Sequence, residues 1–250
     1  MIKPIIPMNN ADKTVAALKS YYGTGPRNWH TRQDAFKRKR GLRDMQNPID
    51  FAFNVLISTV LSQRTRDENT DKAAQQLFAK YSNPRQLSEA STKDIQKLIK
   101  PAGFYRQKAP RIKEISRIIV EKYDGNVPKE MDKLLLLPGV GRKTANCVLV
   151  YGFGIPAVPV DTHVHRISNR LGIVKTRNPE QTELSLMKII PKKHWLLLNQ
   201  LFVIHGQNIC RPVGHKCNIC PVNKYCSYYK DVYEVSSRRL RKRAKHRDRQ

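Results

Sequence analysis

A lysine and an aspartate near the middle of the chain are the residues best suited to covalent chemistry. Lys143 stands in LPGVGRKTA (residues 137–145), and Asp161 follows 18 positions later in VPVDTHVHR (158–166). Arg142, the positive charge of the whole chain and the start of a predicted helix all disfavour the ammonium form of Lys143. A neutral amine can attack a carbon of carbonyl or oxocarbenium character and form a Schiff base. The local sequence supports equally a lysine that stays charged and binds phosphate.

The glycines before Lys143 favour a phosphate site of a particular kind. A nucleotide P-loop is excluded, because that motif places lysine directly after its last glycine and Arg142 intervenes here. Gly139 and Gly141 instead fit a tight turn between two helices, where the missing Cβ lets another backbone approach. The unpaired N–H groups that open the second helix attract anions, and a DNA phosphate suits them. The alternative is an ordinary helical hairpin whose glycines serve geometry alone.

Asp161 precedes the helical pattern THVHRISNRLG and is therefore a candidate N-cap, whose carboxylate accepts from free N–H groups. A carboxylate held in this way stays ionised. It can also stabilise the positive charge that develops on a deoxyribose ring as a base departs. The two roles are compatible. For the nearby His163 and His165 we expect packing or phosphate contact rather than catalysis.

Charge points to a polyanionic partner. The chain has 47 Lys and Arg against 20 Asp and Glu, a net charge of +27, so nucleic acid is the first candidate. A membrane surface is the second, but no apolar run approaches the roughly 18 residues of a spanning helix, and no signal peptide is evident. Residues 37–43 and 237–250 are basic runs. We expect the second to be a disordered tail that adds phosphate contacts.

Four cysteines form a second chemical cluster. Cys210, Cys217, Cys220 and Cys226 have the spacing C-x6-C-x2-C-x5-C, whereas Cys147 stands alone and is expected to be a buried thiol. Four thiols so close together, without a secretory signal, indicate a metal site in a reducing compartment rather than disulfides. Spacing alone allows tetrahedral zinc or a [4Fe–4S] cluster.

The elements that would position these residues are predicted to be helices. Apolar residues recur at helical spacing, and strand signals are confined to AVPV (157–160). Ser91 is a predicted N-cap, Pro179 a predicted helix start, and Gly103, Gly125 and Gly172 are predicted C-terminal stops. The helical segments are 51–61, 72–81, 112–123, 144–153, 165–174 and 194–206.

The combination of L-P-G-V-G-x-K-T-A with V-D-T-H-V-x-R resembles the endonuclease III family of helix-hairpin-helix DNA glycosylases, over about three quarters of the chain. The resemblance implies an all-α, helix-hairpin-helix glycosylase fold with a six-helix barrel and an iron–sulfur domain. It further implies Lys143 as the nucleophile, Asp161 as the second catalytic group, and a structural [4Fe–4S] cluster on the four cysteines. The expected activity is base-excision repair: removal of oxidised pyrimidines through a lysine Schiff base, then β-elimination 3′ to the lesion.

The resemblance also implies how the enzyme reaches a base in a duplex, since the nucleotide must be flipped out. Phe104 falls where the family has an apolar wedge, and Arg64 falls where it usually has glutamine, so Gln63 is an alternative contact to the opposite base. The full set of expected DNA-binding residues is Gln63, Arg64, Phe104, Tyr105, Lys108, Leu137, Gly139, Val140, Gly141, Arg142, Arg211 and Lys216.

The expected organisation has four parts: residues 1–44 as an N-terminal segment of the cluster domain, 45–155 as the barrel, 156–230 as the cluster domain and 231–250 as a basic tail. We expect a monomer that acts on double-stranded DNA with damaged bases or abasic sites, in the cytoplasm or nucleoid, or in the nucleus if the source is eukaryotic. Two alternatives remain open. One is a related glycosylase for 8-oxoguanine or uracil, and the other is a non-catalytic DNA-binding module.

Overall fold

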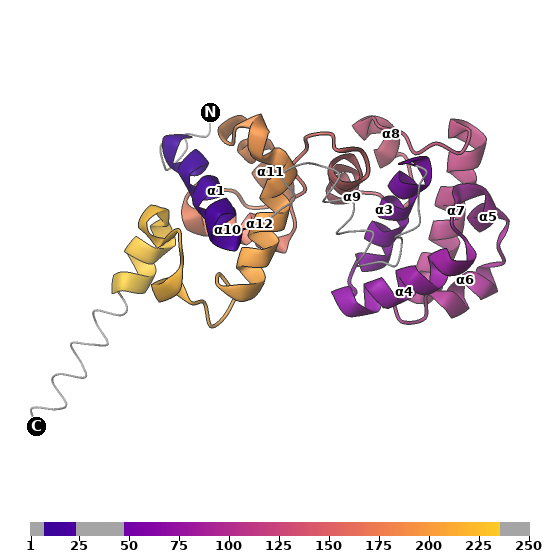
Figure 1. The fold of residues 1–250 in the computed structure, drawn as a ribbon, viewed down its shortest axis with the longest axis horizontal. Coiled ribbons are helices and arrows are strands. Elements are labelled where there is room, and N and C mark those ends of the chain that lie inside the picture. Colours follow the sequence, from indigo (N-terminus) through magenta and orange to yellow (C-terminus); the bar gives the residue numbers. More distant parts are fainter. Residues whose placement is uncertain (1–7, 24–47, 236–250) are drawn as a thin grey trace, which may run out of the picture. The chain divides into compact units, whose positions relative to one another are not determined.

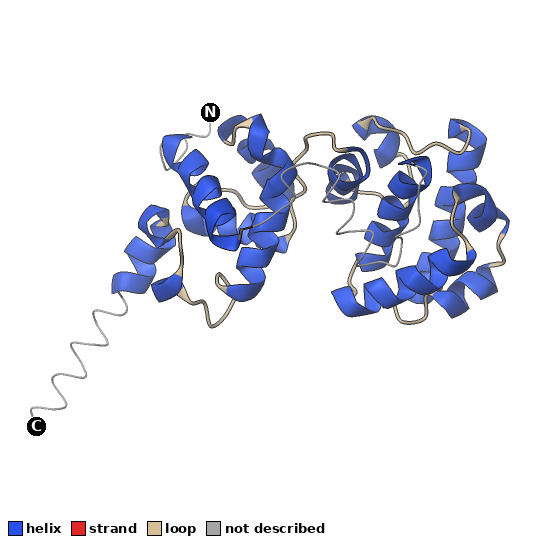
Figure 2. Cartoon of the chain, in the orientation of Figure 1, coloured by secondary structure: helices blue, strands red, loops and turns tan. Residues whose placement is uncertain are grey.

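A computed structural model describes residues 8–23 and 48–235 of the chain, and all regular elements in these ranges are helical (Figures 1 and 2). The predicted all-α class is therefore confirmed. The stretch AVPV (157–160) forms no strand. The basic run at 37–43 and the basic tail at 237–250 lie outside the described residues. Within the described ranges, no helix combines the length and the apolar character that crossing a membrane requires.

Contacts divide the described chain into two compact units, of residues 48–159 and of residues 8–23 with 160–235. The first unit contains α3 (Pro48–Ser62), α4 (Asp67–Lys80), α5 (Pro84–Glu89), α6 (Thr92–Leu98), α7 (Tyr105–Tyr123), α8 (Met131–Leu135), α9 (Arg142–Cys147) and the π-helix η1 (Val148–Gly152). The second contains α1 (Met8–Tyr22), α10 (Thr162–Leu171), α11 (Pro179–Ile189), α12 (Trp195–Asn208), the short 3₁₀-helices η2 (Lys192–His194), η3 (Cys217–Ile219) and η4 (Asn223–Tyr225), and the π-helix η5 (Tyr229–Glu234).

Helix α3 is the core of the first unit. Every residue from 51 to 61 is buried, because the helix is apolar on all sides and is covered by α4, α7, α9 and η1. The approach of η1 is close: a Cβ added to Gly152 would lie 3.3 Å from the Cα of Ala52. The candidate lysine and its hairpin are thus carried on a helix that is packed directly against the core.

In the second unit, α12 contacts both α1 and α10, so the N-terminal helix joins elements that come much later in the chain. Side chains fasten this contact at two points. The hydroxyl of Tyr22 and Nδ1 of His205 are 2.9 Å apart, and Nε2 of His194 lies 2.6 Å from Oδ1 of Asp12. This unit therefore has its own core, built on α12.

Several helix boundaries follow their predicted signals. Ser91 Oγ accepts from the N–H of Asp94, Asn178 caps the helix that begins at Pro179, and Gly172 ends α10 with a φ of 78°. The apolar segment 112–123 is helical as predicted, and the helix extends further toward the N-terminus. Helix α7 begins at Tyr105, and Pro110 removes one hydrogen bond in it without ending the helix.

Gly103 was predicted to be a C-terminal stop, but α6 already ends at Leu98, and the residue with positive φ in this turn is Phe104, at 58°. A Cβ at position 103 would lie 3.1 Å from the carbonyl oxygen of Arg64, a tight contact that favours glycine there.

Candidate functional site

The hairpin between α8 and α9 is a tight turn with two exposed glycines. The N–H of Val140 donates to the oxygen of Leu137 at 3.1 Å, and Gly141 provides the N-cap of α9. Gly139 adopts a φ of 72°, which favours glycine over other residues. The side chains of Leu137 and Val140 are buried. These two predicted DNA-binding residues therefore offer only main-chain atoms to a ligand, whereas Gly139 and Gly141 expose their backbone.

Lys143 lies in the first turn of α9, two residues after the glycine turn. It is exposed, and within the described residues its ammonium has no hydrogen-bond or carboxylate partner. Its neighbour Thr144 is buried and Arg142 is half-buried, so the helix fixes the backbone of Lys143 while its side chain reaches solvent. An amine in this position is free to meet a ligand held at the turn.

Gln63 supports the hairpin from α3. Its Nε2 donates to the carbonyl oxygen of Gly139 at 3.0 Å and lies 3.4 Å from the hydroxyl of Thr144. Sequence reasoning named Gln63 as an alternative contact to the opposite base. In this structure its amide is already engaged in holding the turn, so its observed role is to position the hairpin.

Lys108 departs from the prediction that it contacts DNA. It is 3% exposed, and its ammonium donates to the oxygens of Leu61, Gln63 and Thr65 at 2.7, 2.6 and 2.8 Å. Burial, together with the charge of Arg111, lowers the pKa of Lys108 to about 8. Lys108 is buried because of the backbone next to it. The loop that ends α3 leaves two carbonyl groups without helical partners, and the lysine satisfies them.

Arg64 and Phe104 form an exposed pair beside this loop. Both have left-handed backbones, with φ of 53° and 58°, and the Arg64 guanidinium lies 5.8 Å from the centre of the Phe104 ring. Phe104 is 52% exposed, although large aromatic side chains gain most by burial. Two strained, exposed residues that touch each other are typical of a functional contact. Tyr105, the next residue, is half-buried, with the Arg106 guanidinium over its ring.

Asp161 caps α10 as predicted, since its Oδ1 accepts from the N–H of Val164 at 2.8 Å. The carboxylate is half-exposed and belongs to the second unit. The two histidines that follow it are held by other groups: His163 Nδ1 lies 3.1 Å from the Arg166 guanidinium, and His165 Nδ1 lies 2.7 Å from the hydroxyl of Thr182. Both histidines have the packing roles expected of them.

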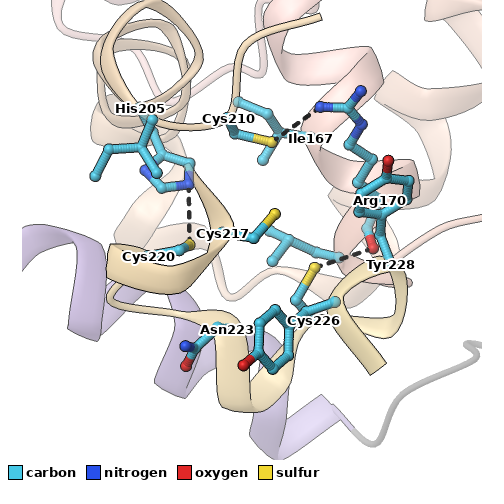
Figure 3. Close-up of a pocket in the computed structure, with 12 residues that line it drawn as sticks. Ile167, Arg170, His205, Cys210, Cys217, Cys220, Asn223, Cys226 and Tyr228 are labelled. Atoms are coloured by element: carbon cyan, nitrogen blue, oxygen red, sulfur yellow. Dashed lines mark hydrogen bonds between the residues drawn. The ribbon is translucent and has the colours of Figure 1, made fainter. Parts of the chain in front are cut away.

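The four C-terminal cysteines line one pocket and their sulfur atoms point into it (Figure 3). None of them is in a disulfide. Burial raises the pKa of Cys217 to about 11 and that of Cys220 to about 12, and it also raises the pKa of Cys226. No three Cys, His, Asp or Glu side chains in the described part of the chain are arranged to share a single metal ion. The pocket thus gathers the four thiols that follow α12 in the sequence.

Sequence reasoning missed Arg170, which connects this pocket to the loop after Cys210. Its guanidinium lies 3.5 Å from the sulfur of Cys210 and covers the ring of Tyr228 (Figure 3). It also donates to the carbonyl oxygens of Arg211 and Pro212, at 2.7 and 3.1 Å. Arg166, one turn earlier on α10, donates to the oxygen of Cys210 at 2.9 Å. The i, i+4 spacing of two arginines was the available signal.

The loop that Arg170 holds carries two predicted DNA contacts. Arg211 and Lys216 are exposed, and Nε of Arg211 donates to the oxygen of Gln207 at 3.1 Å. The structure thus presents both cations to solvent on a loop tied at its first residues.

Comparisons with known proteins agree with this geometry. The family model of the HhH-GPD superfamily base excision DNA repair proteins matches residues 57–192. Endonuclease III of Thermotoga maritima is 57% identical over 178 residues, which cover 71% of this chain and 84% of that protein.

Solved structures match as well. A non-covalent endonuclease III–DNA complex superposes with a TM-score of 0.77 at 30% identity, covering 92% of this chain and 99% of that one. A trapped endonuclease III–DNA covalent intermediate, an estranged-adenine complex, gives 0.73 at 30% identity and covers 90% and 98%. The chain therefore belongs to the endonuclease III family of HhH-GPD base excision DNA repair proteins, which are DNA glycosylases and AP lyases.

Proposed function

We propose that Lys143 is the nucleophile of a bifunctional DNA glycosylase and AP lyase that removes oxidised pyrimidines. The observation that carries the proposal is the position of Lys143, exposed and without a partner in the described residues, on the helix that follows the glycine turn. A turn that anchors the DNA backbone brings this amine to a sugar carbon. Such positioning is a large part of catalysis.

The proposed reaction has two stages, base displacement and β-elimination. The Lys143 amine forms a bond to C1′ as the glycosidic bond breaks, and the base leaves with its electron pair and takes up a proton. Opening of the sugar ring gives an imine between Lys143 and C1′. The imine acidifies the C2′ proton, and loss of that proton expels the 3′ phosphate and cuts the strand.

Asp161 is proposed as the second catalytic group. Its Oδ1 accepts from the N–H of Val164, so the carboxylate is held in place at the start of α10. An ionised carboxylate stabilises positive charge as it develops on the deoxyribose. The same side chain is thereby both the cap of a helix and a catalytic group.

DNA access is assigned to Arg64 and Phe104. Flipping the damaged nucleotide leaves a gap in the stack and an unpaired partner base. The exposed ring of Phe104 can wedge into the gap, and the guanidinium of Arg64 can hydrogen-bond the partner base. Arg211 and Lys216 add phosphate contacts from the cysteine-rich region, and Tyr105 and Arg142 lie beside the wedge and the hairpin.

A [4Fe–4S] cluster is proposed as the group held by Cys210, Cys217, Cys220 and Cys226. The four sulfurs point into one pocket, and four thiolates are the usual ligands of such a cluster. Four thiolates can also hold zinc, and the place of this cysteine loop in a chain of the endonuclease III family favours the cluster. When bound, the cluster serves as a structural cross-link between α12 and the loops that follow it.

The test is Schiff-base trapping. Wild-type protein is incubated with borohydride and duplexes that contain an oxidised pyrimidine, an abasic site, 8-oxoguanine or uracil. We expect a covalent adduct with the first two. Lys143→Gln should abolish the adduct and strand cleavage while DNA binding is retained. Lys133→Gln, at an exposed lysine of the same hairpin, is the matched control and should behave as wild type.

Adducts with purine lesions alone would refute the pyrimidine assignment. Cleavage that survives in Lys143→Gln would refute the proposed nucleophile, and a wild-type protein that binds DNA without any cleavage would be a binding module.

A further inference from the structure

Arg111 of α7 lies directly against the glycine turn of the hairpin. A Cβ built on Gly139 would stand 2.5 Å from Cδ of Arg111, 2.7 Å from its Nε and 3.0 Å from its Cζ. The arginine therefore occupies the space that a side chain at position 139 would need. The φ of 72° favours glycine at position 139, and Arg111 packs in the space that the missing Cβ leaves open.

The charge of Arg111 is not compensated within the described residues. It is half-buried, and neither a carboxylate nor a hydrogen-bond acceptor of the described chain pairs with it. On the same helix, Arg117 is by contrast bonded to Glu114 and Glu121. An arginine held in place by packing, yet left without an anion, is suited to bind an anionic ligand.

The surroundings of Arg111 strengthen this inference. Lys108, one turn earlier on α7, adds a second positive charge, and its own three acceptors are neutral groups. The side-chain amide of Gln63 donates to the carbonyl oxygen of Gly139, so this partially negative oxygen already has a hydrogen-bond donor. The hairpin thus presents exposed glycine backbone beside a guanidinium, with a second, buried positive charge one turn away.

We propose that Arg111 binds a backbone phosphate of DNA at the hairpin turn, as a binding residue supplied by α7 in addition to the hairpin itself. A guanidinium matches the geometry of a phosphate with two parallel hydrogen bonds. The contact positions the backbone and reads no sequence. The inference rests on the proposed function, because it takes DNA as the ligand of this turn.

The experiment measures binding of the full-length protein to a duplex with a tetrahydrofuran abasic analogue, over a series of salt concentrations. The analogue has no C1′ leaving group, so binding is measured without turnover. Arg111→Gln should weaken binding several-fold at low salt and reduce the slope of log K against log salt by about 0.9, the value for one lost phosphate contact. Arg111→Lys keeps the charge and should keep the slope.

Arg117→Gln is the matched control, because it removes the same charge from the same helix at a residue already paired with carboxylates. It should leave the slope at the wild-type value. A wild-type slope in Arg111→Gln, or an equal reduction in Arg117→Gln, would overturn the proposal. Far-UV circular dichroism and the melting temperature show whether each variant is folded. If Arg111→Gln is not folded, Arg111→Met takes its place: the slope should again fall by about 0.9, and a wild-type slope in that variant would overturn the proposal.

Failure here is separable from failure of the proposed function. Loss of Schiff-base trapping in the wild type concerns the chemistry of Lys143. An unchanged salt slope in Arg111→Gln, with trapping intact, concerns only the phosphate contact.

Discussion

The ammonium nitrogen of Lys108 lies 2.6 Å from the carbonyl oxygen of Gln63. This hydrogen bond ties the loop between α3 and α4 to helix α7. The same loop carries Arg64 in a left-handed conformation, and Gln63 itself reaches the hairpin. A single buried cation therefore supports the exposed pair and the glycine turn together. Arg64 and Phe104, which are proposed to contact DNA, therefore depend on Lys108, which is buried.

Lys108→Met should destabilise the protein through this loop. The substitution has a similar length but leaves the oxygens of Leu61, Gln63 and Thr65 without their shared donor. Buried acceptors without partners cost about 1–3 kcal/mol each, and we expect a total loss of about 2–4 kcal/mol in the free energy of unfolding. Urea denaturation measures it. A loss below about 0.5 kcal/mol, the usual size for an exposed lysine, would contradict the assigned role.

The pH dependence of stability should carry the signature of Lys108. Its pKa in the folded protein is about 8, below the unfolded value of about 10.4, so the folded state releases its proton first. Between these two values the unfolded chain binds more protons, and the free energy of unfolding therefore rises with pH. We expect wild type to gain stability relative to Lys108→Met from pH 8 to 10. A constant difference between the two proteins over this range would show that the lysine is not shifted.

Arg64→Gln should change the preference for the base opposite the lesion. Arginine forms bidentate hydrogen bonds with guanine, and glutamine forms bidentate hydrogen bonds with adenine. We expect wild type to favour lesions opposite guanine and the variant to lose that preference, by about 1–3 kcal/mol. Single-turnover cleavage of one lesion opposite each of the four bases measures the effect. Identical profiles for wild type and variant would remove Arg64 from the opposite-base contact.

Asp161→Asn separates the two roles of the aspartate. Asparagine caps helices about as well as aspartate, so stability should stay within about 0.5 kcal/mol. The carboxylate is lost, and the rate of base removal should fall by about 10² or more. Asp161→Ala loses both and should cost a further ~1 kcal/mol of stability. Base removal at the wild-type rate in Asp161→Asn would leave the residue with the cap alone.

Cys226→Ser should prevent loading of the cluster and remove the visible absorption that iron–sulfur proteins show, with parallel loss of iron and sulfide by chemical assay. Zinc in place of iron in the wild-type protein would refute the cluster.

Arg170→Met tests the support of the loop that follows Cys210. It removes two hydrogen bonds to the carbonyl oxygens of Arg211 and Pro212, and we expect about 1–3 kcal/mol lower stability and faster proteolysis between residues 211 and 216. Unchanged proteolysis in Arg170→Met would show that Arg170 does not support this loop.

The sequence by itself determined the all-helical class, the hairpin turn and several helix ends. These depend on local physics: helical spacing of apolar residues, the left-handed freedom of glycine at 172, and side-chain caps such as Ser91 and Asp161. The matching pair of motifs around Lys143 and Asp161 also identified the family. Each of these signals lies within a few residues of the feature that it predicts.

The tertiary structure decided what the remaining polar side chains do. Lys108 and Gln63 looked like DNA contacts in sequence, yet long-range hydrogen bonds to residues 61 and 139 engage them inside the first unit. Arg111 and Arg170 carried no motif, and their roles arise from contacts with Gly139 and with the loop after Cys210. A side chain with several rotatable bonds can serve a distant partner or solvent, and only the packing of α7 and α10 selects between them.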